Sequence, residues 1–486
     1  MSGDASSKLR QFAPTTQAPL KDQLHGFLQQ SVARGVLRRG MQMPSSRDYA
    51  SMIGVSRNTV VAVYERLVLE GYFEARVGAG TFVRDREVVS VQMVASASLT
   101  RGFSDLSQRG RAYAAQSITW GPRSASTVAF RSGQPALEAF PFKLWHRLSN
   151  GMAQRTVMRL ASYQPAQGHE GLRKAIAAFL GVSRGIRCSA NEILVTTGSQ
   201  QGLHLIFSML LDSGDQAIVE DPGYIGAAGS LRAHRAVVCP VPMDRHGLLV
   251  SEAMLRYPGA KLAVVTPTHQ FPTGVCMSQA RRQALVDWAA GHDRWVVEDD
   301  YDGEFQYGGG GMPALRSLDP ARVLYVGSFS KVLHPDLRLG FLVLPLRLMD
   351  AFVQAKALID RHTPALAQEV LSRFILEGHM QRHLRRMREL YLERQGLLIE
   401  ALADTTDGRI QLAPSRAGMH LFHDGGPAMD DTRLSALAHS GHVEVAPASA
   451  FCLASSRRGL LFGYAAFDAE TIRAAAVKLR TCWAKP

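Results

Sequence analysis

The chain has 486 residues, of which 46% are hydrophobic and 20% are charged. A chain of this length is expected to form two or three domains, and its composition is typical of globular proteins. It contains no run of about 18 or more apolar residues and no apolar signal-peptide core near its start. We therefore expect a cytoplasmic protein and exclude a membrane-spanning one.

The cysteines predict neither a disulfide framework nor a metal site. There are five of them, an odd number, and they are scattered without CxxC spacing. Reduced thiols of this kind fit the cytoplasm. Their positions are Cys188, Cys239, Cys276, Cys452 and Cys482.

Part of the net charge of +13 lies near the N-terminus. Residues 1–84 hold 11 Lys and Arg residues against 6 Asp and Glu residues, a balance of +5. A basic terminal module often binds nucleic acid, although a solvated surface would give the same balance.

Three helices and a hairpin are predicted in this basic segment. Apolar residues at helical spacing predict a first helix that ends near Gly35. Ser45 or Ser46 is expected to cap a short second helix that stops at Gly54, and Ser56 to cap a third. Two short strands about a Gly-Ala-Gly turn follow. Two short helices joined through a glycine, followed by a glycine hairpin, predict a winged helix-turn-helix.

The same segment resembles a known DNA-binding family. Its motif "PSSR…GVSRNTV…YERL…GY…R.G.GTFV" is similar, almost position for position, to the GntR-type DNA-binding domain. We assign this domain to residues 14–84. The resemblance implies that the helix beginning near Arg57 enters the major groove of double-stranded DNA. The residues expected to contact DNA are Ser46, Arg47, Ser56, Arg57, Asn58, Thr59, Arg76, Gly78 and Gly80.

Within that set the expected roles differ. Arg57 has the forked guanidinium group that suits a guanine edge, whereas Arg47 is expected to bind phosphate. Ser46 and Arg47 would cap the preceding helix against the DNA backbone. Arg76, Gly78 and Gly80 would form the wing, where missing side chains let the backbone approach a groove. The alternative is that these arginines only decorate a solvated helix.

Residues 85–125 have the composition of a linker. They are rich in Ser, Ala, Gly and Arg and show no sustained period. A flexible coil of this length spans roughly 35 Å. That reach would allow the N-terminal domain to pack on another subunit.

From residue 126 onward the pattern predicts an α/β domain. Short apolar runs alternate with amphipathic helices, which is typical of a mainly parallel sheet covered by helices. The strands "EILVTTGSQQ", "QAIVEDPGY", "KLAVVTPTHQFPTG", "RWVVEDDYDGEF" and "VLYVGSFSK" each end in polar residues. Because ligands bind at the carboxyl ends of such strands, we expect these clusters to form one site.

The chemistry of the clusters indicates pyridoxal 5′-phosphate (PLP). The helix that begins near Ser199 offers free N–H groups for a phosphate, and Arg338 could reach the same dianion. Tyr224 could stack on a planar ring. Asp299 would hold a pyridine nitrogen, because a buried carboxylate needs a cation. Lys331 at a buried strand end could form a Schiff base with the cofactor.

The order and spacing of these clusters resemble fold-type I aminotransferases over residues 126–486, with a small subdomain from about residue 371 to 486. The whole chain resembles a MocR/GabR-type regulator of the GntR superfamily. The resemblance implies Lys331 as the Schiff-base lysine and Asp299 on the pyridine nitrogen. The remaining cofactor residues that it implies are Tyr301 on the ring hydroxyl, Tyr224 against the ring, and Ser199, Gln200, Ser328 and Arg338 on the phosphate.

Two positions depart from the aminotransferase pattern. Phe271 precedes "PTG" where the enzymes usually have Asn. Leu461 in "GLLFGYAAF" aligns with the arginine that binds the substrate carboxylate, while Arg457 and Arg458 lie on an earlier turn. An α-amino-acid carboxylate would then lack its bidentate partner.

Weaker features remain open. The basic segment "RHLRRMRELYLER" (382–394) could contact DNA or form a solvated helix face. His269, His334 and His420 lack metal-ligand spacing and are interpreted as polar neighbours of the cleft.

Two functional hypotheses follow. The favoured one is a PLP-dependent transcription regulator with little or no aminotransferase activity, in which the cofactor or an amine or amino-acid ligand biases a homodimer on operator half-sites or direct repeats. The alternative is a working aminotransferase with an accessory DNA-binding module. The sequence does not identify the effector.

Overall fold

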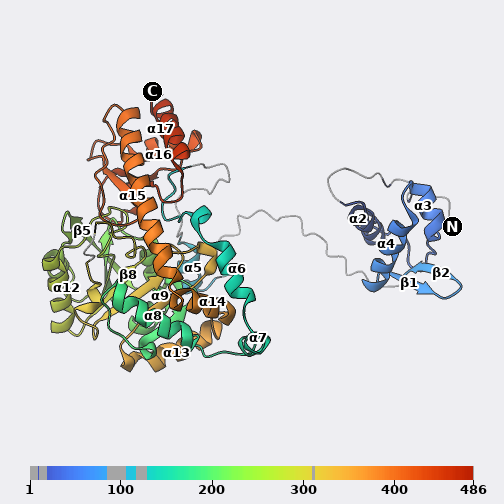
Figure 1. Cartoon of the computed structure of the whole chain (residues 1–486), viewed down its shortest axis with the longest axis horizontal. Helices are drawn as coiled ribbons and strands as arrows, with labels where there is room; N and C mark the ends of the chain where they lie inside the picture. The colour runs from blue at the N-terminus through green and yellow to red at the C-terminus, as the bar shows by residue number, and fades with distance from the viewer. Residues whose placement is uncertain are drawn as a thin grey trace. The chain divides into compact units, whose positions relative to one another are not determined.

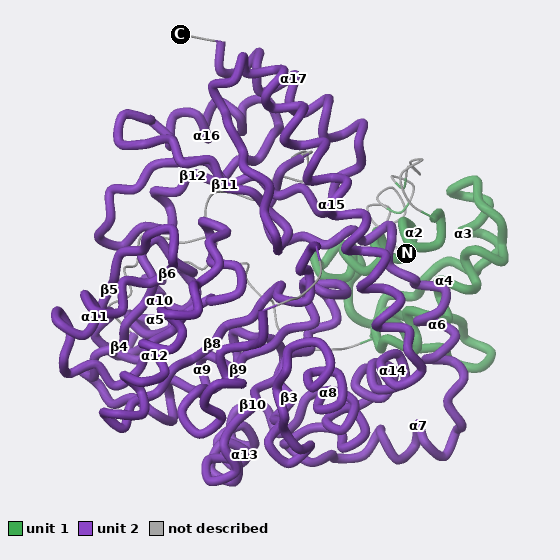
Figure 2. Tube along the Cα trace, turned by 60° about the vertical axis from the view of Figure 1, so that its left-hand side comes forward, with its two compact units in different colours: residues 1–102 green, residues 103–486 purple. Residues whose placement is uncertain are grey.

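The computed structural model describes residues 19–84, 106–116, 129–308 and 312–484, together with Leu9 and Phe12. The chain divides into two compact units, residues 1–102 and 103–486 (Figure 2). None of the helices in the described ranges is long and apolar enough to cross a membrane. The predicted domain boundaries near residues 14 and 125 lie outside the described residues, as does most of the predicted linker.

The first unit contains the predicted three helices and hairpin. They are α2 (Leu20–Ala33), α3 (Ser46–Ile53), α4 (Arg57–Leu69), β1 (Phe73–Arg76) and β2 (Gly80–Val83) (Figure 1). The Ser45 hydroxyl accepts a hydrogen bond from the Asp48 backbone N–H at 3.2 Å, and α3 ends at Gly54 in a left-handed conformation. Ser45 is therefore the cap, and the prediction that Ser46 caps this helix is wrong, because Ser46 already lies in its first turn.

An aromatic contact joins α3, α4 and the hairpin. The rings of Tyr49 and Tyr64 stack at 6.1 Å, and Tyr64 meets Phe73 edge-on at 5.5 Å. All three are buried, together with Leu24 and Leu67. Each such side chain contributes about 1.5–3 kcal/mol by burial, so a small core holds the recognition helix at a set angle to the wing.

Part of the predicted linker is ordered against the second unit. Residues 108–114 form α5 (Gln108–Ala114), which packs on α10 (Ile225–Ala233). The Tyr113 hydroxyl lies 3.3 Å from His204 Nδ1, and its ring meets that of His234.

The second unit is built on an eight-stranded sheet of order β3-β10-β9-β8-β7-β4-β5-β6. Its strands are β3 (Ile193–Thr196), β4 (Gln216–Asp221), β5 (Val237–Asp244), β6 (Gly247–Leu248), β7 (Leu262–Val265), β8 (Trp295–Asp300), β9 (Val323–Ser328) and β10 (Gly340–Val343). The run from β9 to β5 is parallel, whereas β10 is antiparallel to both of its neighbours. A mainly parallel sheet is confirmed.

Helices cover both faces of this sheet (Figure 1). They are α8 (Glu170–Ser183), α9 (Ser199–Leu210), α10, α11 (Val250–Arg256), α12 (Gln279–Gly291), α13 (Leu346–Asp360) and α14 (Ala365–Leu376). The helices α6 (Phe142–Asn150) and α7 (Gln154–Leu160) pack on α14. Successive β9 residues alternate between two cores: Leu324 and Val326 pack with side chains of α9 and α13, and Tyr325 packs with those of α8 and α14.

The C-terminal part forms a smaller layer. Its elements are α15 (His379–Thr405), β11 (His420–Asp424), α16 (Asp431–Ser440), β12 (Ala446–Pro447), β13 (Gly459–Gly463) and α17 (Ala469–Trp483). The three strands pair antiparallel in the order β11-β13-β12. The long α15 packs on α14 at its start and on α17 further along, so it connects the large sheet to this layer.

Candidate cofactor site and DNA interface

The polar strand ends do converge on one cavity. It has a volume of about 190 Å³ and lies beyond the carboxyl ends of the parallel strands. Its lining comes from the ends of five strands of the large sheet, the segment before α6, and the small layer. The residues are Ser132, Gly133, Ser199, Tyr224, Ile225, Thr266, Phe271, Asp299, Tyr301, Asp302, Lys331, Met419, His420 and Phe451.

Lys331 points into this cavity from the turn after β9. Its ammonium group donates a hydrogen bond to the Gly133 carbonyl at 2.7 Å. Gly133 has a φ of +72°, and a Cβ built on it would lie 2.9 Å from Lys331 Nζ. A side chain at position 133 would therefore displace the lysine head group.

Asp299 is the buried carboxylate of the site. Only 5% of it is exposed, and its Oδ1 atom has no hydrogen-bond partner among the described residues. Burial, with smaller contributions from Asp300 and Glu220, raises the pKa of Asp299 to about 7. An orphaned buried carboxylate oxygen fits a protonated pyridine nitrogen, so this donor set suits PLP.

Beside Asp299 lies a cluster of buried polar side chains. The Tyr301 hydroxyl and Asp302 Oδ2 each lie 3.0 Å from His269 Nδ1. The His269 and His420 rings are 4.5 Å apart, and burial lowers the pKa of His420 well below its usual value. His269, Asp302 and His420 offer ligand atoms within 4.8 Å of one another, a grouping that sequence spacing did not predict.

His334, by contrast, does not line the cavity. Its ring packs against Phe140 and Trp145. The structure places His420 in the lining of the cavity and His269 directly behind Tyr301 and Asp302, whereas the turn after Lys331 directs His334 towards an aromatic cluster.

The N-terminus of α9 forms the anion-binding end of the site. Gly198 precedes the helix with a φ of +125°, and a Cβ there would lie 3.3 Å from an Arg338 guanidinium nitrogen. The glycine thus lets Arg338 approach the free N–H groups of the first turn. Backbone donors and a guanidinium group at one helix terminus suit a phosphate dianion.

Gln200 and Ser328 hold their neighbours instead of lining the cavity. Gln200 Oε1 accepts a hydrogen bond from the Tyr224 hydroxyl at 3.1 Å, and its amide donates to the Gly226 carbonyl at 3.2 Å. The Ser328 hydroxyl accepts from the Ser330 N–H at 3.2 Å. Burial also raises the pKa of Tyr224 to about 12, so its phenol stays neutral. The predicted phosphate contacts of Gln200 and Ser328 stay predictions.

An apolar wall closes the opposite side of the cavity. Phe271 meets the rings of Phe451 at 5.0 Å and His420 at 5.6 Å. Leu461 in β13 is fully buried and belongs to the same apolar cluster. The wall therefore presents carbon where a carboxylate-binding guanidinium group was expected from the aminotransferase pattern.

Sequence reasoning missed Gly133, Asp302, Thr266 and Phe451 as lining residues. Asp302 carried a usable signal, because it directly follows the strand end that holds Asp299 and Tyr301. Phe451 carried none, since it comes from a short 3-10 turn in the small layer.

In the first unit, the exposed residues at the start of α4 are Arg57 and Asn58. Their side chains form no hydrogen bond or ion pair with any residue that the structure describes. Thr59 differs, because it is buried and its hydroxyl lies 2.8 Å from that of Ser56, which caps the helix by accepting the Thr59 N–H. Thr59 thus shapes the helix start. Arg47 is exposed in the first turn of α3.

The wing is a tight turn between β1 and β2. Gly78 and Gly80 have φ values of +76° and +102°. Arg76 pairs with Glu74, and its guanidinium group lies 4.6 Å from the centre of the Phe82 ring. The side chain at the base of the wing is therefore held against the hairpin.

Comparison with known proteins identifies the family of the chain. Residues 20–83 match the family described as bacterial regulatory proteins, gntR family, and residues 135–479 match aminotransferase class I and II. The chain is 36% identical over 471 residues to the probable rhizopine catabolism regulatory protein MocR of Rhizobium meliloti, covering 96% of this chain and 94% of that protein. The chain belongs to the MocR-type regulators.

Other relatives agree with this assignment. The MocR-type regulator described here is 29% identical over 478 residues to the pyridoxine biosynthesis transcriptional regulator PdxR of Corynebacterium glutamicum, covering 97% of each chain. Its second unit resembles the α-aminoadipate aminotransferase LysN of Thermus thermophilus, solved with N-(5′-phosphopyridoxyl)-L-leucine, at 28% identity and a TM-score of 0.68, covering 74% of this chain and 92% of LysN.

These comparisons confirm the predicted family, fold class and general function. The protein is a transcription regulator with a GntR-type DNA-binding domain and an aminotransferase-like domain of a PLP-dependent family. GntR-family regulators bind DNA, and aminotransferase-like homologues are typically dimeric.

Proposed function

We propose that this MocR-type regulator holds PLP on Lys331 and uses the occupied cavity to sense the cofactor or an amine or amino-acid ligand. The observation that carries the proposal is the pairing, in one small cavity, of Lys331 with a buried carboxylate whose Oδ1 has no partner among the described residues. Leaving such an oxygen buried is costly unless a cationic group binds it.

The remaining cavity residues would position the cofactor. Arg338 and the first turn of α9 would hold the phosphate, Tyr224 would lie against the ring, and Tyr301 would donate to the ring hydroxyl. When bound, PLP withdraws electrons from an attached amine. Asp299 would hold the proton at the pyridine nitrogen, and Lys331 would hold the cofactor through its Nζ atom and be released as a free amine when a ligand amine takes its place.

The apolar wall supports a sensing role over rapid turnover. Leu461 provides no fork for a carboxylate, and Phe271 provides no amide donor to the ring hydroxyl. Burial keeps His420 neutral, so it adds no positive charge in their place. An amine ligand, or an amino acid held without a bidentate clamp, is therefore favoured.

A working aminotransferase is the second candidate function, and the grouping of Lys331, Asp299 and Tyr301 around one cavity favours it. The two candidates differ in rate. Ordinary enzymes turn over at about 1–10³ s⁻¹, and a sensor need not.

On DNA, we propose a homodimer that binds two half-sites or direct repeats, with the N-terminal domain of one subunit packed on the other subunit. The length of the segment between the two domains supports this exchange, since 21 residues separate Arg84 from the ordered segment that contains α5, and a coil of that length can span roughly 25 Å. Footprints with a single half-site at saturation would count against it.

The central test is covalent attachment. Borohydride reduction of the PLP-loaded protein should fix the cofactor on the peptide that contains Lys331, and Lys331→Ala should abolish both the trapping and the visible absorbance of the bound cofactor. Lys174→Ala is the matched control, because Lys174 is an exposed lysine that pairs with Glu170 and does not line the cavity. Retention of a reducible chromophore in Lys331→Ala would disprove the assignment.

A further inference from the structure

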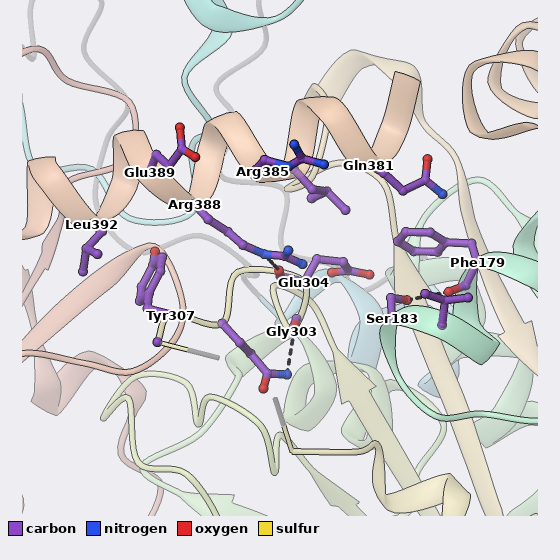
Figure 3. A pocket seen from close by; sticks show the side chains of 14 residues that line it. Phe179, Ser183, Gly303, Glu304, Tyr307, Gln381, Arg385, Arg388, Glu389 and Leu392 are labelled. Carbon is purple, nitrogen blue, oxygen red and sulfur yellow. Dashed lines mark hydrogen bonds between the residues drawn. The ribbon is translucent and has the colours of Figure 1, made fainter. Parts of the chain in front are cut away.

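A second and larger cavity lies in the same unit. Its volume is about 570 Å³, and it is enclosed by the end of α8, the segment that follows β8, and one face of α15 (Figure 3). None of its lining residues lines the cofactor cavity. They are Phe179, Val182, Ser183, Gly303, Glu304, Gln306, Tyr307, Gly308, Gln381, Leu384, Arg385, Arg388, Glu389 and Leu392.

Two arginines on α15 provide the positive charge of this cavity. Arg385 and Arg388 are three residues apart, so they share a helix face. Arg388 Nε donates to the Glu304 carbonyl at 2.8 Å, which holds that side chain over the cavity. Arg385 is exposed and makes no hydrogen bond or ion pair within the described part of the chain. Figure 3 shows the Arg388 side chain directed from the helix towards Glu304, while the Arg385 side chain lies along the same helix.

Glu304 forms the floor between them. It is only 7% exposed, and its Oε2 atom has no partner among the described residues. Burial first, and then Asp300, raise the pKa of the Glu304 carboxyl above its ordinary value. A protonated carboxyl group offers one O–H donor beside the two guanidinium groups. Glu389 at the rim offsets one of the two arginine charges.

Apolar side chains complete the lining. Phe179 is buried against α15, whereas Leu392 and Val182 are exposed at the mouth. A cavity with donors at one side and carbon at the other fits a ligand that has an anionic head and an apolar body.

We propose that this second cavity binds a small organic anion, with a carboxylate or phosphate group between Arg385 and Arg388 and an apolar portion against Phe179 and Leu392. Guanidinium groups bind carboxylate and phosphate oxygens through paired N–H donors. The net charge of the two arginines and Glu389 is one positive charge, which suits a singly charged head group.

A ligand in this cavity would affect the cofactor site through a short segment of chain that the two sites share. The segment with Gly303 and Glu304 directly follows Asp302. Arg184 is buried and bonds Asp300 at 2.7 Å and the Gly303 carbonyl at 3.2 Å. A ligand that ties Arg385 to Glu304 would therefore restrain the same loop that carries Tyr301, and coupling between the two sites must be reciprocal.

The test is calorimetric titration of the full chain with phenyl phosphate and phenylacetate, with benzylamine and inorganic phosphate for comparison. We expect saturable binding of the two aromatic anions at one site per chain that depends on Arg385, apart from phosphate binding at the N-terminus of α9, and no binding of the amine. Arg385→Gln should weaken binding about tenfold or more, because it removes a charge-assisted bond. Arg386→Gln is the matched control, since Arg386 is also exposed on α15 but does not line the cavity.

The outcomes separate clearly. Failure of both anions to bind, or equal weakening by the two arginine variants, would overturn the proposal. If inorganic phosphate bound as tightly as phenyl phosphate, the proposed contact of the ligand with Phe179 and Leu392 would be disproved. Because the titration is performed without PLP, its result does not depend on the assignment of Lys331. Repeating it with PLP should change the dissociation constant if the two cavities are coupled, and an unchanged constant would exclude the coupling.

Discussion

The two functional regions of this regulator place their polar and charged residues in opposite ways. In the DNA-binding domain Arg47, Arg57 and Asn58 are exposed, and a separate aromatic core supports the helices that carry them. In the cofactor cavity Asp299 and its polar neighbours are buried within the fold itself. The difference teaches that the residues proposed to contact DNA should be replaceable without loss of stability, whereas the residues proposed to hold the cofactor should couple binding to folding.

The largest expected effect comes from Asp299→Asn, measured by chemical unfolding without cofactor. The folded-state pKa of about 7 lies above the ordinary value of 3.8, so Asp299 increasingly destabilises the fold as pH rises between these values. Removing the charge should stabilise the chain by roughly 2–4 kcal/mol at pH 8 and by less than half of that at pH 5.

The same variant should bind PLP roughly 10–150-fold more weakly, because a neutral amide cannot form a charge-assisted hydrogen bond to the protonated pyridine nitrogen. Absorbance titration measures this. If Asp299→Asn were less stable at pH 8 and bound PLP normally, the inference that the cavity residues couple binding to folding would be contradicted.

Next in size is the effect of the apolar wall on amino transfer. Each missing charge-assisted contact costs about 1.5–3 kcal/mol, or roughly 10–150-fold in rate. Single-turnover spectra with common α-amino acids should therefore show conversion slower than about 1 s⁻¹. Phe271→Asn should accelerate it, and Phe451→Leu serves as a comparison that leaves the wall apolar. Rates of about 1–10³ s⁻¹ in the unmodified protein would favour the working aminotransferase.

In the DNA-binding domain, Arg57→Ala should cost about 1–3 kcal/mol of operator binding and relax base preference, while leaving the free energy of unfolding unchanged within about 0.5 kcal/mol. Arg47→Ala should weaken binding to all DNA sequences alike. It should also reduce the slope of the logarithm of the binding constant against the logarithm of the salt concentration by about one. Binding assays at several salt concentrations distinguish them. Unchanged operator affinity in Arg57→Ala would contradict the placement of α4 in the groove.

The smallest effect concerns the helix cap. Ser56→Ala removes the acceptor of the Thr59 N–H and should destabilise the N-terminal domain by about 1 kcal/mol, measured on thermal unfolding. Ser45→Ala is a parallel variant at the start of α3 and should behave alike. A larger loss in DNA affinity than in stability would indicate that Ser56 itself contacts DNA.

Local signals predicted the helices of the first unit, since capping serines and Gly54 act within a few residues. They also predicted that Asp299 and Lys331 meet, because parallel strands end at one edge. Sequence reasoning could not find the bond from Lys331 to Gly133, which lies 198 residues away. Nor could it place Phe451 beside Phe271, or β10 antiparallel between two strands, because these depend on tertiary packing.

Leu461 has a consequence for timing in the proposed function. A ligand that cannot be converted efficiently leaves the cavity only by dissociating, so its residence time would set how long each response lasts. With a buried leucine in β13 in place of a guanidinium group, the dissociation rate of the ligand would set the duration of the transcriptional response. Ligands of equal affinity but different dissociation rates could then give responses of different duration.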